Sequence, residues 1–191
     1  MVTPPSLEIR ETDLPGVFLV VPRVFRDDRG FFLESFNENS FAEAGLPIHF
    51  VQDNHSRSSM GVLRGLHYQL EHPQGKLLRV VHGKIFDVVA DIRRGSPTFG
   101  RWVGYVLDDT EPSALWIPPG FAHGFCALSE TVDVMYKCTD FYAPNDERGV
   151  RWDDSLLKIK WPISQPILSE KDRAYPPLSE ARKDLPDYVP S

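Results

Sequence analysis

The sequence has few of the features that mark secreted, membrane and zinc-knuckle proteins. Of its 191 residues only two are cysteine, Cys126 and Cys138, and they do not form a CxxC pair. A disulfide framework or a zinc knuckle needs a larger or closely paired set, so we expect two buried thiols. No apolar run approaches the roughly 20 residues that cross a bilayer, and the first residues lack the basic and apolar regions of a signal peptide. We therefore expect a cytoplasmic protein with no membrane contact.

Positive charge is also limited. Lys and Arg number 21 against 27 Asp and Glu, a formal net charge of −6, and no block of basic residues occurs. Because nucleic-acid polymers are bound by clustered Lys and Arg, the composition argues against such a partner. A small phosphate-bearing ligand stays open, since a few local arginines can hold a phosphate against an acidic background.

Long segments without glycine or proline are scarce. The 13 Gly and 17 Pro are spread so evenly that the longest segment lacking both runs from Phe125 to Ala143. Since neither residue suits a helix interior, a helical bundle is excluded. Short apolar and β-branched runs lie between turn residues at Val17–Val21, Phe31–Phe36, His49–Asn54, Val62–Gln69, Leu77–Val81, Lys84–Asp91, Trp102–Leu107, Ala114–Ile117, Ala122–Leu128 and Val132–Thr139. This pattern predicts an all-β fold, a jelly-roll barrel or sandwich with a few short helices.

We expect a single domain over residues 1–191. A length of this order suits one β-barrel or sandwich, and no linker or internal repeat divides the chain. One short helix is predicted at Ser40–Ala44, with Ser40 as its N-cap and Glu43 completing a capping box. From about residue 163 the chain becomes an irregular, proline-rich tail, with one helical turn expected near Leu178–Lys183.

A metal site can be tested for, because metal-binding barrels of the cupin type place an HxH pair on one strand and a further His after a PxG turn. The turn and its histidine are present in Pro118–His123, but Gln69 stands where a second histidine would follow His67. A first-row metal needs three or four N, O or S donors, so we expect no metal. The other use of an imidazole in a cavity is proton transfer near neutral pH.

On the strand that carries His67, it matters which side chains point to the same side. Regular alternation puts Arg64 and Leu66 on one side and Gly65 and His67 on the other. Arg64 and His67 could share one ligand only through a bulge or bend, for which Gly65 is the natural position. From the residues alone, His67 can equally be an ordinary core or surface histidine.

Three further residues have both a structural and a functional interpretation. Arg29 lies in a turn, either solvated or placed to grip a phosphate at the barrel mouth. Lys76 comes just before an apolar strand, where it is either an exposed turn lysine or a second basic residue that contacts a ligand. Tyr136 shares a face with Val134, as a core aromatic or with its hydroxyl meeting a ligand.

Several blocks of the sequence occur together, in the same order, in one known family. They are Gly61–Gln69, Gln74–Leu77, Asp87–Gly100, Leu115–Phe125, Tyr136–Tyr142 and Leu168–Asp172. Through them the chain resembles the dTDP-4-dehydrorhamnose 3,5-epimerases, metal-independent enzymes with a cupin-type jelly-roll fold. The resemblance implies that fold here, no cofactor, and a dTDP-4-keto-6-deoxyhexose as the substrate.

The resemblance also implies a reaction and a role for each matched residue. The family inverts C3 and C5 of dTDP-4-dehydro-6-deoxy-D-glucose, both α to the C4 carbonyl, to give dTDP-4-dehydro-L-rhamnose by proton transfer. The matched catalytic residues are His67 as base, Asp172 as its partner, Tyr136 as acid and Lys76 beside the C4 oxygen. The matched substrate-binding residues are Arg29 and Arg64 at the diphosphate, Tyr142 as a platform for the thymine ring, and Glu34, Gln52, Asn54, His123, Glu147 and Lys171.

Two other functions and one assembly stay open from the sequence. A relative that inverts only C3 or only C5 would keep the same acid–base residues, and a sugar-nucleotide-binding cupin without catalysis is a further alternative. Family members are homodimers in which an N-terminal strand joins the partner's sheet, and Val17–Val21 is the candidate strand here.

Overall fold

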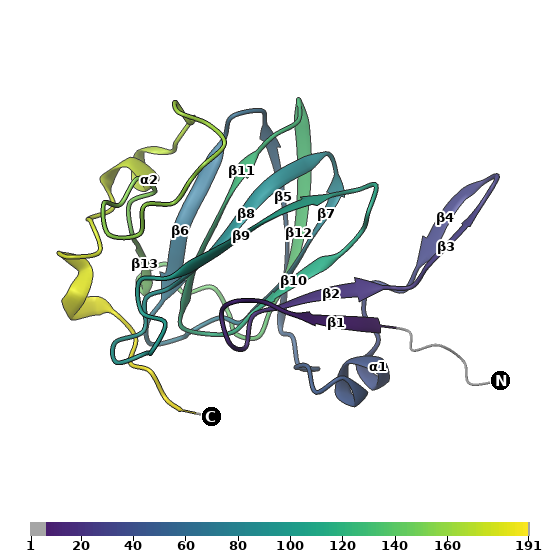
Figure 1. Cartoon of the computed structure of the whole chain (residues 1–191), viewed down its shortest axis with the longest axis horizontal. Helices are drawn as coiled ribbons and strands as arrows, with labels where there is room; N and C mark the ends of the chain where they lie inside the picture. The colour runs from purple at the N-terminus through teal and green to yellow at the C-terminus, as the bar shows by residue number, and fades with distance from the viewer. Residues whose placement is uncertain (1–6, 191) are drawn as a thin grey trace.

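Two antiparallel sheets face each other in this protein (Figure 1). The structure is a computed structural model and describes residues 7–190. The six-stranded sheet has the order β1 (Leu7–Glu11), β2 (Phe18–Pro22), β10 (Ala114–Ile117), β7 (Lys76–His82), β12 (Thr131–Cys138), β5 (Gln52–Ser59). The five-stranded sheet has the order β13 (Glu147–Gly149), β6 (Leu63–Gln69), β11 (Phe121–Ala127), β8 (Lys84–Asp91), β9 (Trp102–Asp108). The predicted all-β, cupin-type jelly roll is confirmed.

Three smaller parts lie outside these sheets. The strands β3 (Val24–Asp27) and β4 (Gly30–Leu33) form a hairpin that projects from the sandwich (Figure 1). The helix α1 (Glu38–Glu43) lies beneath the six-stranded sheet, and α2 (Glu170–Ala174) and a 3₁₀ turn (Ala181–Asp184) belong to the C-terminal tail. Within residues 7–190, no helix is both long and apolar enough to cross a membrane.

Apolar side chains from alternate strand positions fill the space between the sheets. Leu78 and Val134 point inward from the six-stranded sheet and Val89 from the five-stranded sheet, and all three are fully buried. Period-two alternation places such residues on one face of a strand. The same inward rows continue into Lys76 on β7 and Tyr136 on β12, so the interior becomes polar toward one end.

The outer faces of the sandwich are covered as well. Phe41 of α1 packs with Trp116 on the six-stranded sheet, while Leu178 and Leu185 of the tail pack with Val88 on the five-stranded sheet. Strand β11 is therefore buried at every position. A strand buried on both faces has no alternation of apolar and polar residues, which is what the β11 sequence shows.

Two local predictions differ from the structure. The short helix is capped by Asn37, not Ser40, because the Asn37 Oδ1 accepts from the N–H groups of Asn39 and Ser40 at 3.0 and 3.2 Å. The strand predicted at His49–Asn54 is found at Gln52–Ser59. An apolar pattern misses it because its inward residues near the polar end of the interior are themselves polar.

Strand β2, which contains most of the predicted Val17–Val21 strand, is not at the edge of its sheet. Strand β2 pairs with β1 on one side and with β10 on the other, within the same chain. Within this chain, Val17–Val21 therefore offers no free edge for the partner's sheet that it was predicted to join. The outer edge belongs to β1, and the described strands outside both large sheets are β3 and β4.

Candidate active site

A pocket of about 310 Å³ opens between the sheets where their inward rows become polar. Its lining consists of Gln52, Asn54, Ser56, Arg64, His67, Gln74, Lys76, His123, Phe125, Tyr136, Tyr142, Glu147 and Lys171. Asp172 lies behind His67, to which it is hydrogen-bonded. Of the predicted site residues, only Arg29 and Glu34 lie elsewhere.

His67 and Asp172 form a hydrogen-bonded pair in the pocket wall. The His67 Nε2 lies 2.5 Å from the Asp172 Oδ1. Burial alone raises the pKa of Asp172, but hydrogen bonds from His67 and Ser169 outweigh it, and the pKa ends below its ordinary value. Because an ionised carboxylate only accepts hydrogen bonds, Nε2 carries the proton, and the lone pair of Nδ1 is left available.

The short helix α2 holds Asp172 in place. Ser169 is the N-cap of α2, and its Oγ accepts from the Asp172 N–H at 3.1 Å and donates to the Asp172 Oδ2 at 2.7 Å. Burial lowers the pKa of His67, and this effect outweighs the neighbouring Asp172 carboxylate, which raises it. His67 is therefore a neutral base at pH 7.

A bulge at Gly65 lets Arg64 and His67 face the same pocket. Across the β6–β11 pair, His67 lies opposite His123 while Arg64 lies opposite Phe125, so β6 holds one residue more than β11 in this interval. Gly65 has a φ of 128°, and a Cβ there would lie 2.5 Å from the Gly124 Cα. Only glycine fits, which resolves the conflict that strict alternation creates.

Lys76 and Tyr136 reach the pocket from the opposite sheet. Neither the Lys76 ammonium nor the Tyr136 hydroxyl has a hydrogen-bond partner among the described residues, so both are available to a ligand. Burial lowers the pKa of Lys76, and nearby Glu147 and Asp87 offset only part of this. Burial also raises the pKa of Tyr136, which keeps its hydroxyl protonated at neutral pH. The core-aromatic and ligand-facing interpretations of Tyr136 both hold in part, since its ring packs on the core.

His123 belongs to a second histidine–aspartate pair. Its Nε2 lies 2.9 Å from the Oδ2 of Asp87, which is fully buried on the neighbouring strand β8. The other carboxylate oxygen of Asp87 is buried without a hydrogen-bond partner among the described residues. The pair anchors His123 in the pocket floor and places a buried carboxylate near Lys76.

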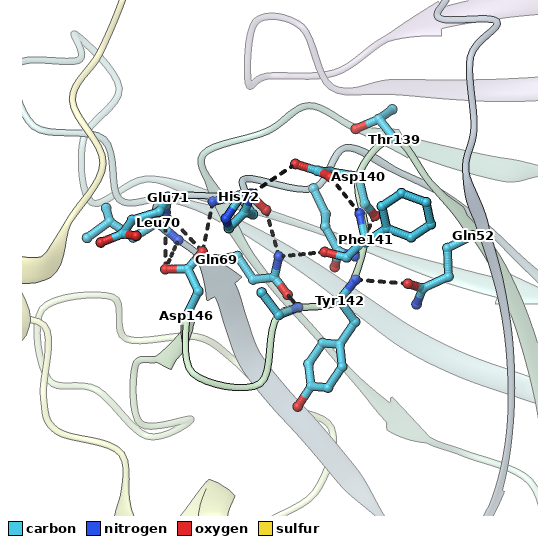
Figure 2. A network of polar contacts seen from close by, with 12 residues as sticks. Gln52, Gln69, Leu70, Glu71, His72, Thr139, Asp140, Phe141, Tyr142 and Asp146 are labelled. Carbon is cyan, nitrogen blue, oxygen red and sulfur yellow. Dashed lines mark hydrogen bonds and ion pairs between the residues drawn. The ribbon is translucent and has the colours of Figure 1, made fainter.

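A chain of polar contacts links the remaining lining residues. The Tyr142 hydroxyl donates to Glu147 at 2.6 Å, and Glu147 accepts from the Lys171 ammonium at 2.7 Å. Gln52 accepts from the Tyr142 N–H at 2.8 Å, as Figure 2 shows, and donates to Asn54 at 3.0 Å. These contacts hold polar side chains around the pocket before any ligand enters.

Arg29 and Glu34 are exposed and lie on or beside the β3–β4 hairpin, apart from the pocket. The Arg29 guanidinium is bound to Asp27 at 2.6 Å, and 90% of its side chain is exposed. The hairpin also presents three exposed aromatic side chains, Phe25, Phe31 and Phe32. Within this chain, neither of these two predicted contacts lines the pocket.

Sequence reasoning missed three lining residues, Ser56, Gln74 and Phe125. Ser56 and Phe125 follow Asn54 and His123 by two residues, so extending the alternation of each strand would have found them. Among residues 7–190 there is no cluster of three or more His, Cys, Asp or Glu side chains suited to a metal ion. The pocket instead combines imidazole, phenol and several cationic side chains.

Comparison with known proteins gives this arrangement a family. A sequence model described as dTDP-4-dehydrorhamnose 3,5-epimerase matches residues 11–180. The chain belongs to this family. The enzyme of that name from Pseudomonas aeruginosa is 59% identical over 162 residues, which cover 84% of this chain and 90% of the relative.

Solved structures agree with this family. A dTDP-6-deoxy-D-glucose-3,5-epimerase from Legionella pneumophila, solved with dTDP-4-keto-L-rhamnose, has a TM-score of 0.93 and 46% identity, covering 96% of this chain and all of that one. A 3'-monoepimerase from Streptomyces bikiniensis, solved with dTDP-quinovose, has a TM-score of 0.88 and 35% identity, covering 93% of this chain and 92% of that one. The epimerase fold is thus shared with enzymes of more than one specificity.

Proposed function

We propose that this protein epimerises dTDP-4-dehydro-6-deoxy-D-glucose at C3 and C5 to give dTDP-4-dehydro-L-rhamnose. The observation that carries the proposal is the division of the pocket between two sheets. The base, His67, comes from the five-stranded sheet, and Tyr136 and Lys76 come from the six-stranded sheet that faces it. A substrate bound between the sheets has a proton acceptor on one side and a proton donor on the other, as inversion requires.

Each inversion is a proton exchange at a carbon next to the C4 carbonyl. The Nδ1 of His67 takes the proton, and the electron pair of the broken C–H bond moves into an enolate whose oxygen meets the Lys76 ammonium. The Tyr136 hydroxyl then returns a proton to the opposite face of the same carbon. His67 then gives its proton to solvent and Tyr136 takes one back from solvent, so both groups are restored before the second carbon is inverted. No net oxidation occurs, so the chemistry requires no cofactor.

The pocket also suits a nucleoside diphosphate. Arg64, Lys76 and Lys171 bring three positive charges to its wall, against Glu147. Arg64 is oriented by Ser58, which accepts from its Nε at 3.0 Å. Cations with fixed geometry are the usual partners of phosphate groups. We assign the diphosphate to Arg64 and the base ring to Tyr142.

Inversion of both carbons, not one, is favoured by the identity of 59% to a 3,5-epimerase against 35% to a 3'-monoepimerase. Incubation with the substrate in deuterated water and NMR of the product tests this directly. We expect solvent deuterium at both C3 and C5. Deuterium at only one carbon would mean a single-site epimerase, and deuterium at neither would mean a binding protein without catalysis.

We further propose that the active form is a homodimer in which the β3–β4 hairpin enters the partner's site. Its exposed Phe25, Phe31 and Phe32 are typical of an interface, and Arg29 and Glu34 would complete the partner's pocket. Mixing Arg29→Ala with His67→Asn chains tests the arrangement. If the site is shared, mixed dimers carry one intact site, and activity returns to about a quarter of the wild-type level after subunit exchange. If the subunits exchange and activity does not return, the shared site is contradicted.

We also propose that residues 1–191 act as one domain in the cytoplasm. The free, buried thiols of Cys126 and Cys138 are compatible with a reducing compartment. Limited proteolysis of the full chain should give a single protected fragment.

A further inference from the structure

The segment Asp140–Ala143, which carries Tyr142 into the pocket wall, belongs to no helix or strand (Figure 2). Side chains hold its peptide groups instead. Three glutamines make these contacts: Gln74 donates to the Asp140 C=O at 2.8 Å, Gln69 donates to the Phe141 C=O at 3.2 Å, Gln52 accepts from the Tyr142 N–H at 2.8 Å, and Gln69 accepts from the Ala143 N–H at 2.9 Å. The conformation of Tyr142's backbone thus depends on glutamine amides.

Gln69 makes the largest share of these contacts. It ends strand β6, is 5% exposed, and binds Phe141 and Ala143 on either side of Tyr142. Its Nε2 also donates to the His72 C=O at 2.6 Å. Two N–H donors and one acceptor are therefore all in use, and of the side chains similar in length only an amide supplies that set.

The turn that follows Gln69 is fixed independently. The Asp146 carboxylate, 6% exposed, accepts from the N–H groups of Leu70, Glu71 and His72 at 2.8 to 3.3 Å (Figure 2). Burial alone raises the pKa of Asp146, and these backbone hydrogen bonds outweigh it, so the pKa lies below its ordinary value. Gln69 therefore joins a fixed turn to the otherwise irregular segment that bears Tyr142.

The position of Gln69 is the one at which metal-binding barrels of this type carry a second histidine. Here the amide is committed to backbone groups of two chain segments, and His67 two residues earlier is committed to Asp172. The same strand thus supplies a base at one residue and a support for the binding wall at the next inward residue.

We propose that Gln69 is a positioning residue that holds Tyr142 in place and so sets the affinity for the nucleotide end of the substrate, apart from proton transfer. The ligand's identity rests on the proposed function. Removing the amide leaves the Phe141 C=O and the Ala143 N–H without their partner. Tyr142 then keeps its own contacts with Gln52 and Glu147 but loses the support of the peptide groups on either side of it. Binding weakens because this segment has to be ordered each time.

Steady-state kinetics of Gln69→Leu and Gln69→Glu test the proposal, with Gln165→Leu on the exposed surface as the control. The Leu variant loses all three contacts, and the Glu variant keeps an acceptor for the Ala143 N–H. We expect KM to rise about tenfold in the Leu variant and less in the Glu variant, with kcat changed less than about threefold. The control should match the wild type.

A double-mutant cycle decides whether Gln69 acts through Tyr142. Calorimetry with dTDP alone, which needs no turnover, should give Tyr142→Ala and the double variant Gln69→Leu/Tyr142→Ala the same dissociation constant. Hydrogen exchange at the Ala143 N–H should speed up in Gln69→Leu. Additive losses of affinity, a fall in kcat at unchanged KM, or failure of both Gln69 variants to fold would each overturn the proposal.

These readouts also separate the inference from the proposed function. A wild-type chain that binds dTDP without epimerising the sugar refutes the function and leaves the role of Gln69 to be decided by calorimetry. A wild-type chain that epimerises, with Gln69→Leu binding dTDP normally, refutes the role of Gln69 alone.

Discussion

Two histidine–aspartate pairs lie in one pocket and differ in burial. The side chain of His67 is 25% exposed and that of Asp172 5%, whereas His123 is 9% exposed and Asp87 not at all. The two histidines lie opposite each other on β6 and β11. Both pairs consist of the same two groups, but the imidazole of His67 is more exposed to the pocket than that of His123.

The pairs also differ in how each carboxylate is held. Asp172 comes from α2, 105 residues from His67, and its second oxygen is bound by Ser169. Asp87 comes from β8, the strand beside β11, and its second oxygen has no hydrogen-bond partner among the described residues. The negative charge of Asp87 raises the pKa of Lys76. In the proposed mechanism the first pair acts as a base with a supporting carboxylate, and the second holds His123 as a ligand contact beside Lys76.

Replacing each histidine by asparagine should give the largest difference in activity between the two pairs. His67→Asn removes the only base we assign, so kcat should fall about 1,000-fold, while the dissociation constant for dTDP changes less than about threefold. His123→Asn should lower kcat/KM by roughly tenfold, the size of a lost hydrogen bond to the substrate. Single-turnover kinetics and calorimetry measure both; equal losses in the two variants would contradict the assignment.

Replacing each aspartate by asparagine should lower kcat less than the His67 substitution does, and the loss should again differ between the two pairs. Asp172→Asn presents an amide that can donate to Nε2, which favours the tautomer with its proton on Nδ1 and removes the base. We expect kcat to fall about 100-fold. Asp87→Asn should lower kcat about tenfold, because His123 loses its anchor and Lys76 loses a nearby negative charge. The ratio of the two kcat values is the measurement, and a larger loss in Asp87→Asn would reverse the roles of the pairs.

The pH dependence of kcat/KM should identify which pair titrates in catalysis. In the proposed mechanism His67 works unprotonated, so activity should rise with pH through its pKa, which burial holds below the ordinary value of about 6.5. Lys76 works protonated, so activity falls at high pH, at a pKa below its ordinary value of about 10.4. Activity should change about tenfold per pH unit on each limb.

The aspartate variants distinguish the two pairs on the acid side of that profile. Asp172 raises the pKa of His67, so removing its charge in Asp172→Asn should move the acid limb to lower pH in the residual activity. Asp87→Asn should leave the acid limb in place and move the alkaline limb to lower pH, since Asp87 raises the pKa of Lys76. A shift of the acid limb in Asp87→Asn instead would place the catalytic titration in the His123 pair.

Much of this architecture could be predicted from the sequence because its signals are local. The spacing of glycine and proline excludes a helical bundle, and the apolar runs predict most of the strands. Gly65 was named as the position of a bulge, and the structure shows why, since only glycine fits against Gly124. The sequence predicts Ser40 as the helix cap although Asn37 holds that role, because Ser and Asn both cap helices well and no local signal favours one over the other.

The parts that were missed depend on contacts between distant segments. Asp172 was placed beside His67 only through the family resemblance, since nothing local ties α2 to β6. Asp87 lies in an apolar strand and gave no sign of pairing with His123. Arg29 and Glu34 matched the family's binding positions, yet one chain keeps them away from its own pocket. A sequence motif places a residue in a family pattern without showing where the fold puts its side chain.

The smallest effect we expect concerns the dependence of Asp172 on its helix cap. Ser169→Ala removes both the cap of α2 and the hydrogen bond to the Asp172 Oδ2. Loss of a cap typically costs about 1 kcal/mol of unfolding free energy, and the freed carboxylate should lower kcat only a few-fold because its bond to His67 remains. Denaturant unfolding and steady-state kinetics check the two effects, with the exposed Ser179→Ala as control. Since Asp87 sits on a strand and has no such cap, the His123 pair should be unaffected. A kcat loss as large as that of Asp172→Asn would instead mean that Ser169, more than the bond to His67, keeps Asp172 in its catalytic position.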